Sequence, residues 1–174
     1  PELFEEKIRQ DRERGLVPFC IAGNAGTTNT GAVDPLDTLA DLAAKEECWF
    51  HVDGAYGGFF YACDEAKERL RGIERSDSVV LDPHKSLFMP YGLGSLLVRD
   101  GEKLRRAHML TADYLQDQYT PEGEWNFAEL SPELSRPFRG LSVWLPLKMF
   151  GFSAFRECLS EKLSLTLWMY QELN

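Results

Sequence analysis

The sequence lacks a long hydrophobic run and is short of basic residues. No apolar stretch approaches the roughly 20 residues that a membrane-spanning helix needs, and the first residues do not follow the pattern of a secretory signal peptide. Lys and Arg number 19 against 28 Asp and Glu, a formal net charge of −9. Such a surface repels phosphate backbones and anionic lipids. We therefore expect no nucleic-acid partner and no membrane.

Cysteines are few and widely spaced. The four are Cys20, Cys48, Cys63 and Cys158, and no CxxC pair occurs among them. Without CxxC pairs a zinc site is not indicated, and a reducing, cytoplasmic setting is the default expectation. His51, Asp53 and His84 form one conceivable ligand set, but they lack the regular spacing of known metal sites. We predict no metal.

The chain has 174 residues, of which 44% are hydrophobic and 27% charged. This is enough apolar material for a core, and the length suits one ordinary domain. The sequence begins at Pro1 without an initiator Met and stops at Asn174 inside a periodic helical segment. We expect the chain to be part of a longer protein, so a site that it carries can be incomplete.

The first half of the chain alternates strands with helices. Three short apolar runs predict strands buried on both faces, at residues 17–22, 49–52 and 78–81. About 25 residues separate one run from the next, and helical patterns at 35–47 (with Asp34 as N-cap) and 65–71 fill the gaps. This is the βαβ pattern of a parallel sheet. A fourth run at 95–98 follows too closely for a crossover helix, so we expect it to be antiparallel. The fold class is α/β.

The second half has a different character. A short helix is predicted at 102–109, followed by a long aperiodic segment at 111–135 with two prolines. A connection of that length is usually functional or a lid. Two closing helices are predicted at 141–150 and 155–173, separated by Gly151. The apolar side chains of the first helix are expected to form a packed face: Trp144, Leu145, Leu147 and Phe150.

Polar side chains follow all three predicted parallel strands. They are residues 24–28, Asp53, and the pair His84 and Lys85. In open parallel sheets, ligands bind just beyond the carboxyl ends of the strands. Asp53 ends an apolar strand, so its carboxylate should be partly buried and need a cationic partner. Lys85 is either a solvated loop residue or an amine in an apolar cleft, where it is more easily neutral and nucleophilic. His51 is expected to be structural.

Four motifs occur in a fixed order along the chain. They are GTTNTGAVDP (26–35), HVDGAYGG (51–58), DPHKSL (82–87) and SRPFRGLSVWLPLKMFG (135–151), with Lys85 32 residues after Asp53. In this order and spacing the sequence resembles the group II pyridoxal 5'-phosphate (PLP) decarboxylases. These include the aromatic-L-amino-acid and glutamate decarboxylases, with the aspartate-aminotransferase-like fold (fold type I). The resemblance runs from about residue 16 to residue 160.

The resemblance implies a carboxy-lyase that decarboxylates a small-molecule L-amino acid with PLP as cofactor. Lys85 would form a Schiff base with PLP, and Asp53 would pair with the protonated pyridine nitrogen, so that the ring can accept electrons. His84 would lie near the phosphate, Thr28 would contact the cofactor, and Ala55 would pack against its ring.

The resemblance also implies an organisation. Residues 1–174 would be part of one large PLP-binding domain, with a mobile loop at about 111–135 and helices at about 141–174 that lead toward a small domain. Such enzymes build their site at a homodimer interface. We therefore expect the isolated chain to be inactive.

The sequence departs from the family pattern at several positions. Asp82 stands where the family commonly has Asn, and a carboxylate beside a phosphate dianion is unfavourable. Ser86 stands where a bulky residue is common. The tyrosine of the mobile loop corresponds to Phe127 by spacing or to Tyr119 by proximity, and Phe127 would favour an aldehyde-forming oxidative deaminase. Another fold-type-I enzyme, such as an aminotransferase or cysteine desulfurase, and a non-catalytic scaffold are the remaining alternatives.

Overall fold

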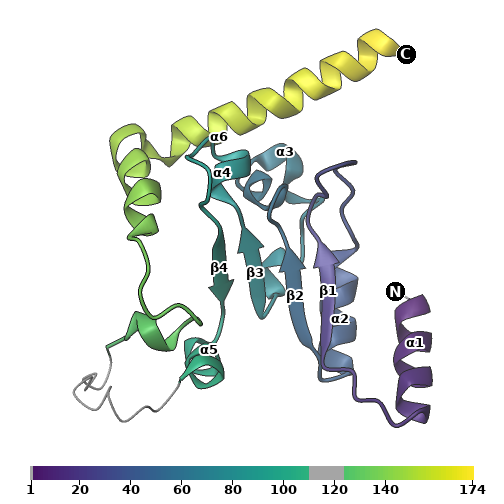
Figure 1. Ribbon diagram of the computed structural model, residues 1–174. Coiled ribbons are helices and arrows are strands. Elements are labelled where there is room, and N and C mark those ends of the chain that lie inside the picture. The colour runs from purple at the N-terminus through teal and green to yellow at the C-terminus, as the bar shows by residue number, and fades with distance from the viewer. Residues whose placement is uncertain (1, 110–123) are drawn as a thin grey trace. The chain divides into compact units, whose positions relative to one another are not determined.

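The computed structural model describes residues 2–109 and 124–174. These residues form two compact units (Figure 1). One unit contains the chain up to Leu97 together with Arg139–Asn174, and the other is Val98–Phe138. The first unit contains the sheet and every predicted site residue. Membership of both units in one large domain stays a prediction.

The first unit is built on a four-stranded sheet with the strand order β1-β2-β3-β4. The strands are β1 (Cys20–Asn24), β2 (Trp49–Asp53), β3 (Ser78–Leu81) and β4 (Ser95–Val98). β2 pairs in parallel with both β1 and β3, whereas the β4 arrow points the opposite way in Figure 1. The α/β fold class and the mostly parallel sheet are therefore confirmed.

The prediction for the first strand was wrong in position and in burial. β1 begins at Cys20, and the preceding Val17 and Phe19 are 83% and 77% exposed. Pro18 between them has no N–H to donate to a sheet. Side chains of β1 and β2 alternate between exposed or half-buried and buried positions. They are not buried on both sides, because the core described here packs against one face.

Helices flank this sheet and supply its core. The elements are α1 (Glu2–Glu13), α2 (Leu36–Lys45), α3 (Asp64–Lys67), α4 (Pro83–Ser86) and the 3-10 turns η1 (Gly58–Ala62) and η2 (Ile73–Arg75). Leu36 and Leu39 of α2 join Ile21 and Phe50 of the strands in one buried cluster. The apolar spacing of α2 thus places its inner side on the buried rows of β1 and β2.

Asp34 does not cap α2, contrary to prediction. Pro35 occupies the N-cap position, and no side chain bonds there. The Asp34 carboxylate instead accepts hydrogen bonds from the backbone N–H and the side-chain amide of Asn24, at 2.7 and 2.9 Å. Asp34 therefore holds the end of β1, which is closer to the candidate site than the helix is.

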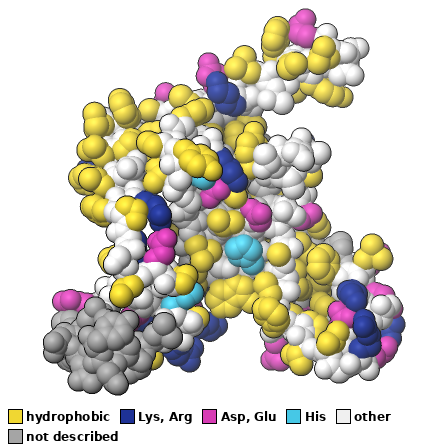
Figure 2. Space-filling model, in the orientation of Figure 1, with side chains coloured by type: hydrophobic (Ala, Val, Ile, Leu, Met, Phe, Trp, Pro, Cys, Tyr) yellow, Lys and Arg dark blue, Asp and Glu magenta, His cyan; other side chains and the backbone are white. Residues whose placement is uncertain are grey.

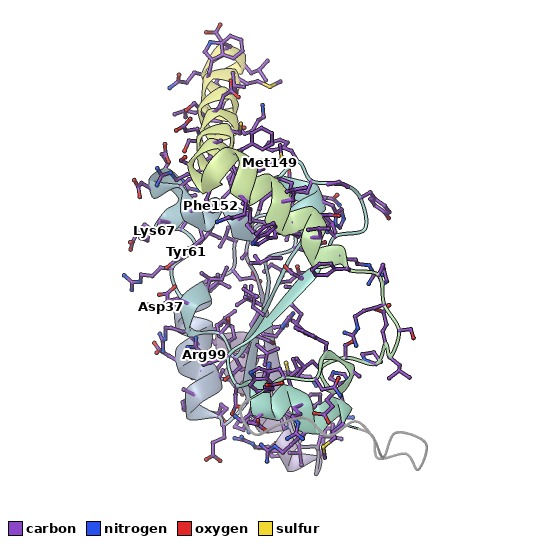
Figure 3. All side chains as sticks on the ribbon, turned by 90° about the vertical axis from the view of Figure 1, so that its left-hand side faces the viewer. Asp37, Tyr61, Lys67, Arg99, Met149 and Phe152 are labelled. Carbon is purple, nitrogen blue, oxygen red and sulfur yellow. The ribbon has the colours of Figure 1, made fainter. Side chains whose placement is uncertain are left out.

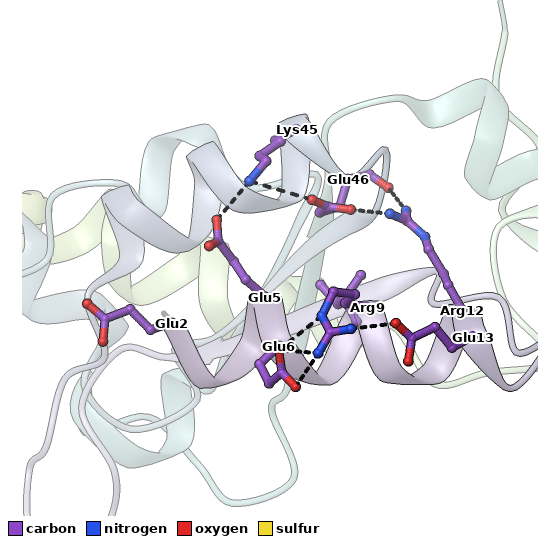
Figure 4. Close-up of a pocket in the computed structure, with 9 residues that line it drawn as sticks. Glu2, Glu5, Glu6, Arg9, Arg12, Glu13, Lys45 and Glu46 are labelled. Carbon is purple, nitrogen blue, oxygen red and sulfur yellow. Dashed lines mark hydrogen bonds and ion pairs between the residues drawn. The ribbon is translucent and has the colours of Figure 1, made fainter.

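The N-terminal helix is attached to the end of α2 by ion pairs (Figure 4). Arg12 pairs with Glu46, and the Lys45 ammonium lies 3.0 Å from the Glu5 carboxylate. Arg9 pairs with Glu6 and Glu13 within α1 itself. Each exposed pair contributes only about 0.2–1 kcal/mol. The main anchor of α1 is Ile8, which is 6% exposed and belongs to the core cluster.

The closing helix α6 (Arg139–Leu173) is broken at Gly151, where φ is 74° and ψ is 153°. The prediction of two helical segments separated by this glycine is confirmed. Met149 and Phe152 lie on either side of the break (Figure 3). Leu159 of the second segment is 1% exposed and packs in a cluster with Leu87.

The predicted packed face of the first segment of α6 was wrong for most of its members. Trp144, Leu145 and Phe150 are 56%, 45% and 64% exposed, and only Leu147 packs against a core cluster. Figure 2 shows hydrophobic side chains along this helix at the surface. The periodicity of the sequence identified an apolar face, but the described residues do not cover it.

The second unit contains α5 (Gly101–His108) and the 3-10 turn η4 (Phe127–Glu129). The Asp100 carboxylate caps α5 by accepting from the N–H groups of Glu102 and Lys103. Arg105 Nε lies 2.5 Å from Glu129 Oε2 and joins the two elements. In the residues that the structure describes, no helix is long and apolar enough to cross a bilayer.

Core packing under β2 yields a first prediction. Phe50 is 2% exposed, whereas Phe19 is 77% exposed. Phe50→Ala should lower the free energy of unfolding by about 3–5 kcal/mol, because it removes buried area and leaves a cavity. Phe19→Ala, the matched control, should change it by less than about 0.5 kcal/mol. Urea unfolding of the native polypeptide that contains this chain measures both. Equal effects would contradict the packing described here.

A second prediction concerns pH. Hydrogen bonds from Arg75, and then from Arg71, lower the pKa of the Asp37 carboxyl below its usual value. The folded state therefore binds this proton less readily than the unfolded state. The stabilisation is present above the unfolded pKa and is lost as pH falls through the folded pKa. Asp37→Asn should lower the urea midpoint at pH 7, and the difference should shrink near pH 3. A difference independent of pH would contradict this role.

Candidate functional site

A pocket of about 130 Å³ lies where β1 and β2 end. The residues that line it are Asn24, Gly26, Thr27, Thr28, Asp53, Ala55, Tyr56 and Lys85. The structure therefore brings together four of the five predicted cofactor-site residues, on three segments that are far apart in the sequence. The fifth, His84, is not among the lining residues.

Asp53 is the last residue of β2, and the parallel register places it beside Asn24 of β1. Its side chain is exposed, and Oδ1 accepts a hydrogen bond from the N–H of Ala55 at 3.1 Å. The prediction of a partly buried carboxylate was therefore wrong. Asp53 belongs to the row of β2 side chains that is exposed or half-buried, so its carboxylate is open to a ligand.

Lys85 is carried by α4, the single turn of helix that follows β3. Its side chain retains 35% exposure, and its ammonium lies 2.9 Å from the carboxylate of Asp82, which is 14% exposed. Ser86, the next residue, is buried and donates a hydrogen bond to the carbonyl of Tyr56. This bond ties the lysine-bearing turn to the loop after β2, which also lines the pocket.

The loops after β1 and β2 approach each other closely. A Cβ at Gly57 would lie 2.3 Å from the Ala25 carbonyl oxygen and 2.7 Å from the Gly26 Cα. Only glycine allows this approach. The Thr27 hydroxyl accepts from the Ala32 N–H at 3.1 Å and holds the first loop in a compact form. These contacts fix the backbone that carries Thr28 and Ala55.

The histidines of the first unit are already hydrogen-bonded within the protein. His84 Nδ1 lies 2.6 Å from the Leu93 carbonyl oxygen, and its ring packs edge-on against Tyr91 at 5.2 Å. His51 Nδ1 lies 2.8 Å from the Ser78 hydroxyl, which confirms its structural assignment. Among the described residues, no group of three or more His, Cys, Asp or Glu side chains is placed to hold a metal ion.

The sequence reasoning missed Tyr56 as a lining residue. Its side chain is 40% exposed and lies directly after Ala55. The sequence signal that could have identified Tyr56 is its position, an aromatic residue three positions after Asp53. Of the two candidates for the loop tyrosine, Tyr119 lies outside the described residues. Phe127 begins η4 in the second unit and is 70% exposed.

The lining residues fit the chemistry of PLP in part. The Lys85 amine suits an aldehyde carbon, the Asp53 carboxylate suits a protonated pyridine nitrogen, and Ala55 leaves space beside a flat ring. Lys85 is the single cation among the eight lining residues. Apart from Lys85, a dianionic phosphate would meet only neutral hydrogen-bond donors in this lining, such as the hydroxyl groups of Thr27 and Thr28.

Comparisons with known proteins agree with this chemistry. The family described as the pyridoxal-dependent decarboxylase conserved domain matches residues 1–174. An aromatic-L-amino-acid decarboxylase of Bacillus atrophaeus is 46% identical over 163 residues, which cover 93% of this chain and 34% of that protein.

Solved structures show the same similarity. Mouse CSAD superposes with a TM-score of 0.87 at 32% identity, covering 99% of this chain and 35% of that one. Oryza sativa TDC, solved with PLP and tryptamine, superposes with a TM-score of 0.80 at 35% identity, covering 87% and 31%. The chain thus spans about a third of the length of these relatives. It belongs to the pyridoxal-dependent decarboxylase family.

Proposed function

We propose that the native polypeptide containing this chain is a carboxy-lyase that uses PLP to remove the α-carboxylate of an L-amino acid. The observation that carries the proposal is the joint position of Asp53 and Lys85 on one pocket at the carboxyl edge of the sheet. Membership in the pyridoxal-dependent decarboxylase family supports this reading of the two residues.

In this proposal, Lys85 and Asp53 would hold different groups of the cofactor. The Lys85 amine would hold it through the aldehyde group. The Asp53 carboxylate holds a proton on the pyridine nitrogen by charge pairing. PLP, when bound, supplies an electron-accepting ring for the electron pair of the breaking bond between Cα and the carboxylate.

The remaining residues would position the cofactor. The Thr28 hydroxyl lines the pocket and would offer a hydrogen bond, and the small side chain of Ala55 would leave space beside the ring. His84 would lie on the phosphate side, with its ring orientation fixed by the bond to Leu93. Orientation of this kind lowers the barrier by holding the reacting groups in place.

We propose aromatic L-amino acids as the first substrates to test, because the bacterial relative at 46% identity is an aromatic-L-amino-acid decarboxylase. An aldehyde in place of the amine is the second candidate product. It would be favoured if Phe127, which corresponds to the loop tyrosine by spacing, holds that place instead of Tyr119. Both products release carbon dioxide, so the organic product distinguishes the two reactions.

A homodimer and a cytoplasmic location complete the proposal. The homodimer rests on the family resemblance. The location is supported by four free cysteines, of which Cys48 and Cys63 are buried. Burial raises the pKa of the Cys48 thiol, which favours its protonated form at neutral pH.

The proposal predicts the behaviour of two variants in the native polypeptide. Lys85→Ala should abolish covalent attachment of PLP, measured by absorbance and by peptide mapping after borohydride reduction. It should also lower carbon dioxide release from aromatic L-amino acids by at least about a thousandfold, because Lys85 is the one amine among the described residues that line the pocket. The matched control is Lys148→Ala on the exposed side of α6, which should leave both measurements unchanged.

Three results would indicate a function other than amino-acid decarboxylation. Attachment of PLP without carbon dioxide release, but with keto-acid formation, would indicate an aminotransferase. An alanine product with transfer of sulfur from cysteine would indicate a desulfurase. Absence of PLP attachment to wild-type protein would indicate a non-catalytic scaffold and would overturn the proposal.

A further inference from the structure

The carboxylate of Asp82 is the closest charged partner of Lys85 that the structure records. We propose that Asp82 is a positioning residue that holds Lys85 Nζ in an ion pair, and so limits the rate at which that amine attaches to an aldehyde. The proposal rests on the function proposed above, and it adds a role for a residue outside the pocket lining.

The geometry of the pair comes from the end of β3. Asp82 follows the strand directly, and its backbone N–H bonds the Ala55 carbonyl at 3.3 Å. Its carbonyl accepts the Lys85 N–H at 2.9 Å, which closes a turn between the two residues. The two side chains then meet at 2.9 Å between Oδ2 and Nζ.

The backbone near Gly94 leaves space for the Asp82 carboxylate in this position. A Cβ at Gly94 would lie 3.1 Å from Asp82 Oδ1, so the missing side chain at Gly94 makes room for the carboxylate. Asp82 makes no side-chain cap on α4, although it occupies the N-cap position. Its carboxylate therefore acts on Lys85 and not on the helix that carries it.

The ion pair has to open before Lys85 reacts. An ammonium has no lone pair, so Nζ must first give one proton to water. The free amine then forms a C–N bond with the aldehyde carbon, and the aldehyde oxygen leaves as water with two protons. The net change joins one ammonium and one aldehyde to give a protonated imine and one water, without oxidation or reduction. The contact of 2.9 Å with the Asp82 carboxylate has to break before Nζ can reach the aldehyde carbon.

The test is Asp82→Asn, which removes the charge and keeps the size of the side chain. At pH 7.5 the second-order rate constant for covalent PLP attachment to the native polypeptide, followed by absorbance, should rise about fivefold. The matched control is Asp64→Asn, an equal change of charge at an exposed position on α3, which should leave the rate unchanged. Asp82→Ser also removes the charge and should also accelerate PLP attachment. It replaces Asp82→Asn in this measurement if that variant folds poorly.

A measurement without cofactor separates this proposal from the function on which it rests. In cofactor-free protein, acetylation of Lys85 relative to exposed Lys148, read by mass spectrometry, should also rise about fivefold in Asp82→Asn. Unchanged labelling and unchanged attachment would overturn the role of Asp82 while leaving the proposed function intact. Failure of wild-type protein to attach PLP at all would overturn the proposed function instead.

A phosphate ligand without an aldehyde tests the main competing explanation. If Asp82 acts only by repelling the phosphate, Asp82→Asn should improve the affinity for pyridoxine 5'-phosphate as much as it accelerates PLP attachment. The proposal expects the gain to be larger for PLP, because only PLP reacts with the amine. Equal gains would contradict it.

Discussion

Parallel pairing of β1, β2 and β3 is the constraint on which the site depends. It brings the carboxyl ends of three strands to one edge, and its register places Asn24 beside Asp53 and Asp53 beside Val80. Lys85 follows β3 by a single helical turn. Asp53 and Lys85 are 32 residues apart in the chain. The parallel pairing is what brings the Asp53 carboxylate and the Lys85 amine to one pocket.

Contacts between the loops that follow the strands form the walls of the pocket at the edge of the sheet. Gly57 lets the loop after β2 press against the loop after β1, and the buried Ser86 hydroxyl joins α4 to Tyr56. The sheet edge therefore becomes a pocket with fixed walls. One row of β2 side chains packs on α2, while the row that ends in Asp53 is exposed or half-buried. The same alternation that builds the core thus presents the carboxylate to a ligand.

Local chemistry explains which features could be predicted from the sequence. β3 and β4 were predicted at their observed bounds, and the break at Gly151 was predicted because glycine adopts a positive φ without strain. The position of β1 was missed, since apolar residues before Cys20 resemble a strand but remain exposed. The exposure of Asp53 depends on what covers each face of the sheet. The Asp82–Lys85 pair depends on side-chain geometry, which residue spacing does not specify.

The most direct measurement is a crystal structure of the native polypeptide that contains this chain, grown with PLP. The account predicts continuous density between Lys85 Nζ and the aldehyde carbon of PLP. It also predicts an Asp53 carboxylate oxygen within about 3 Å of the pyridine nitrogen. PLP bound to a different lysine, or a ring nitrogen that faces away from Asp53, would contradict it.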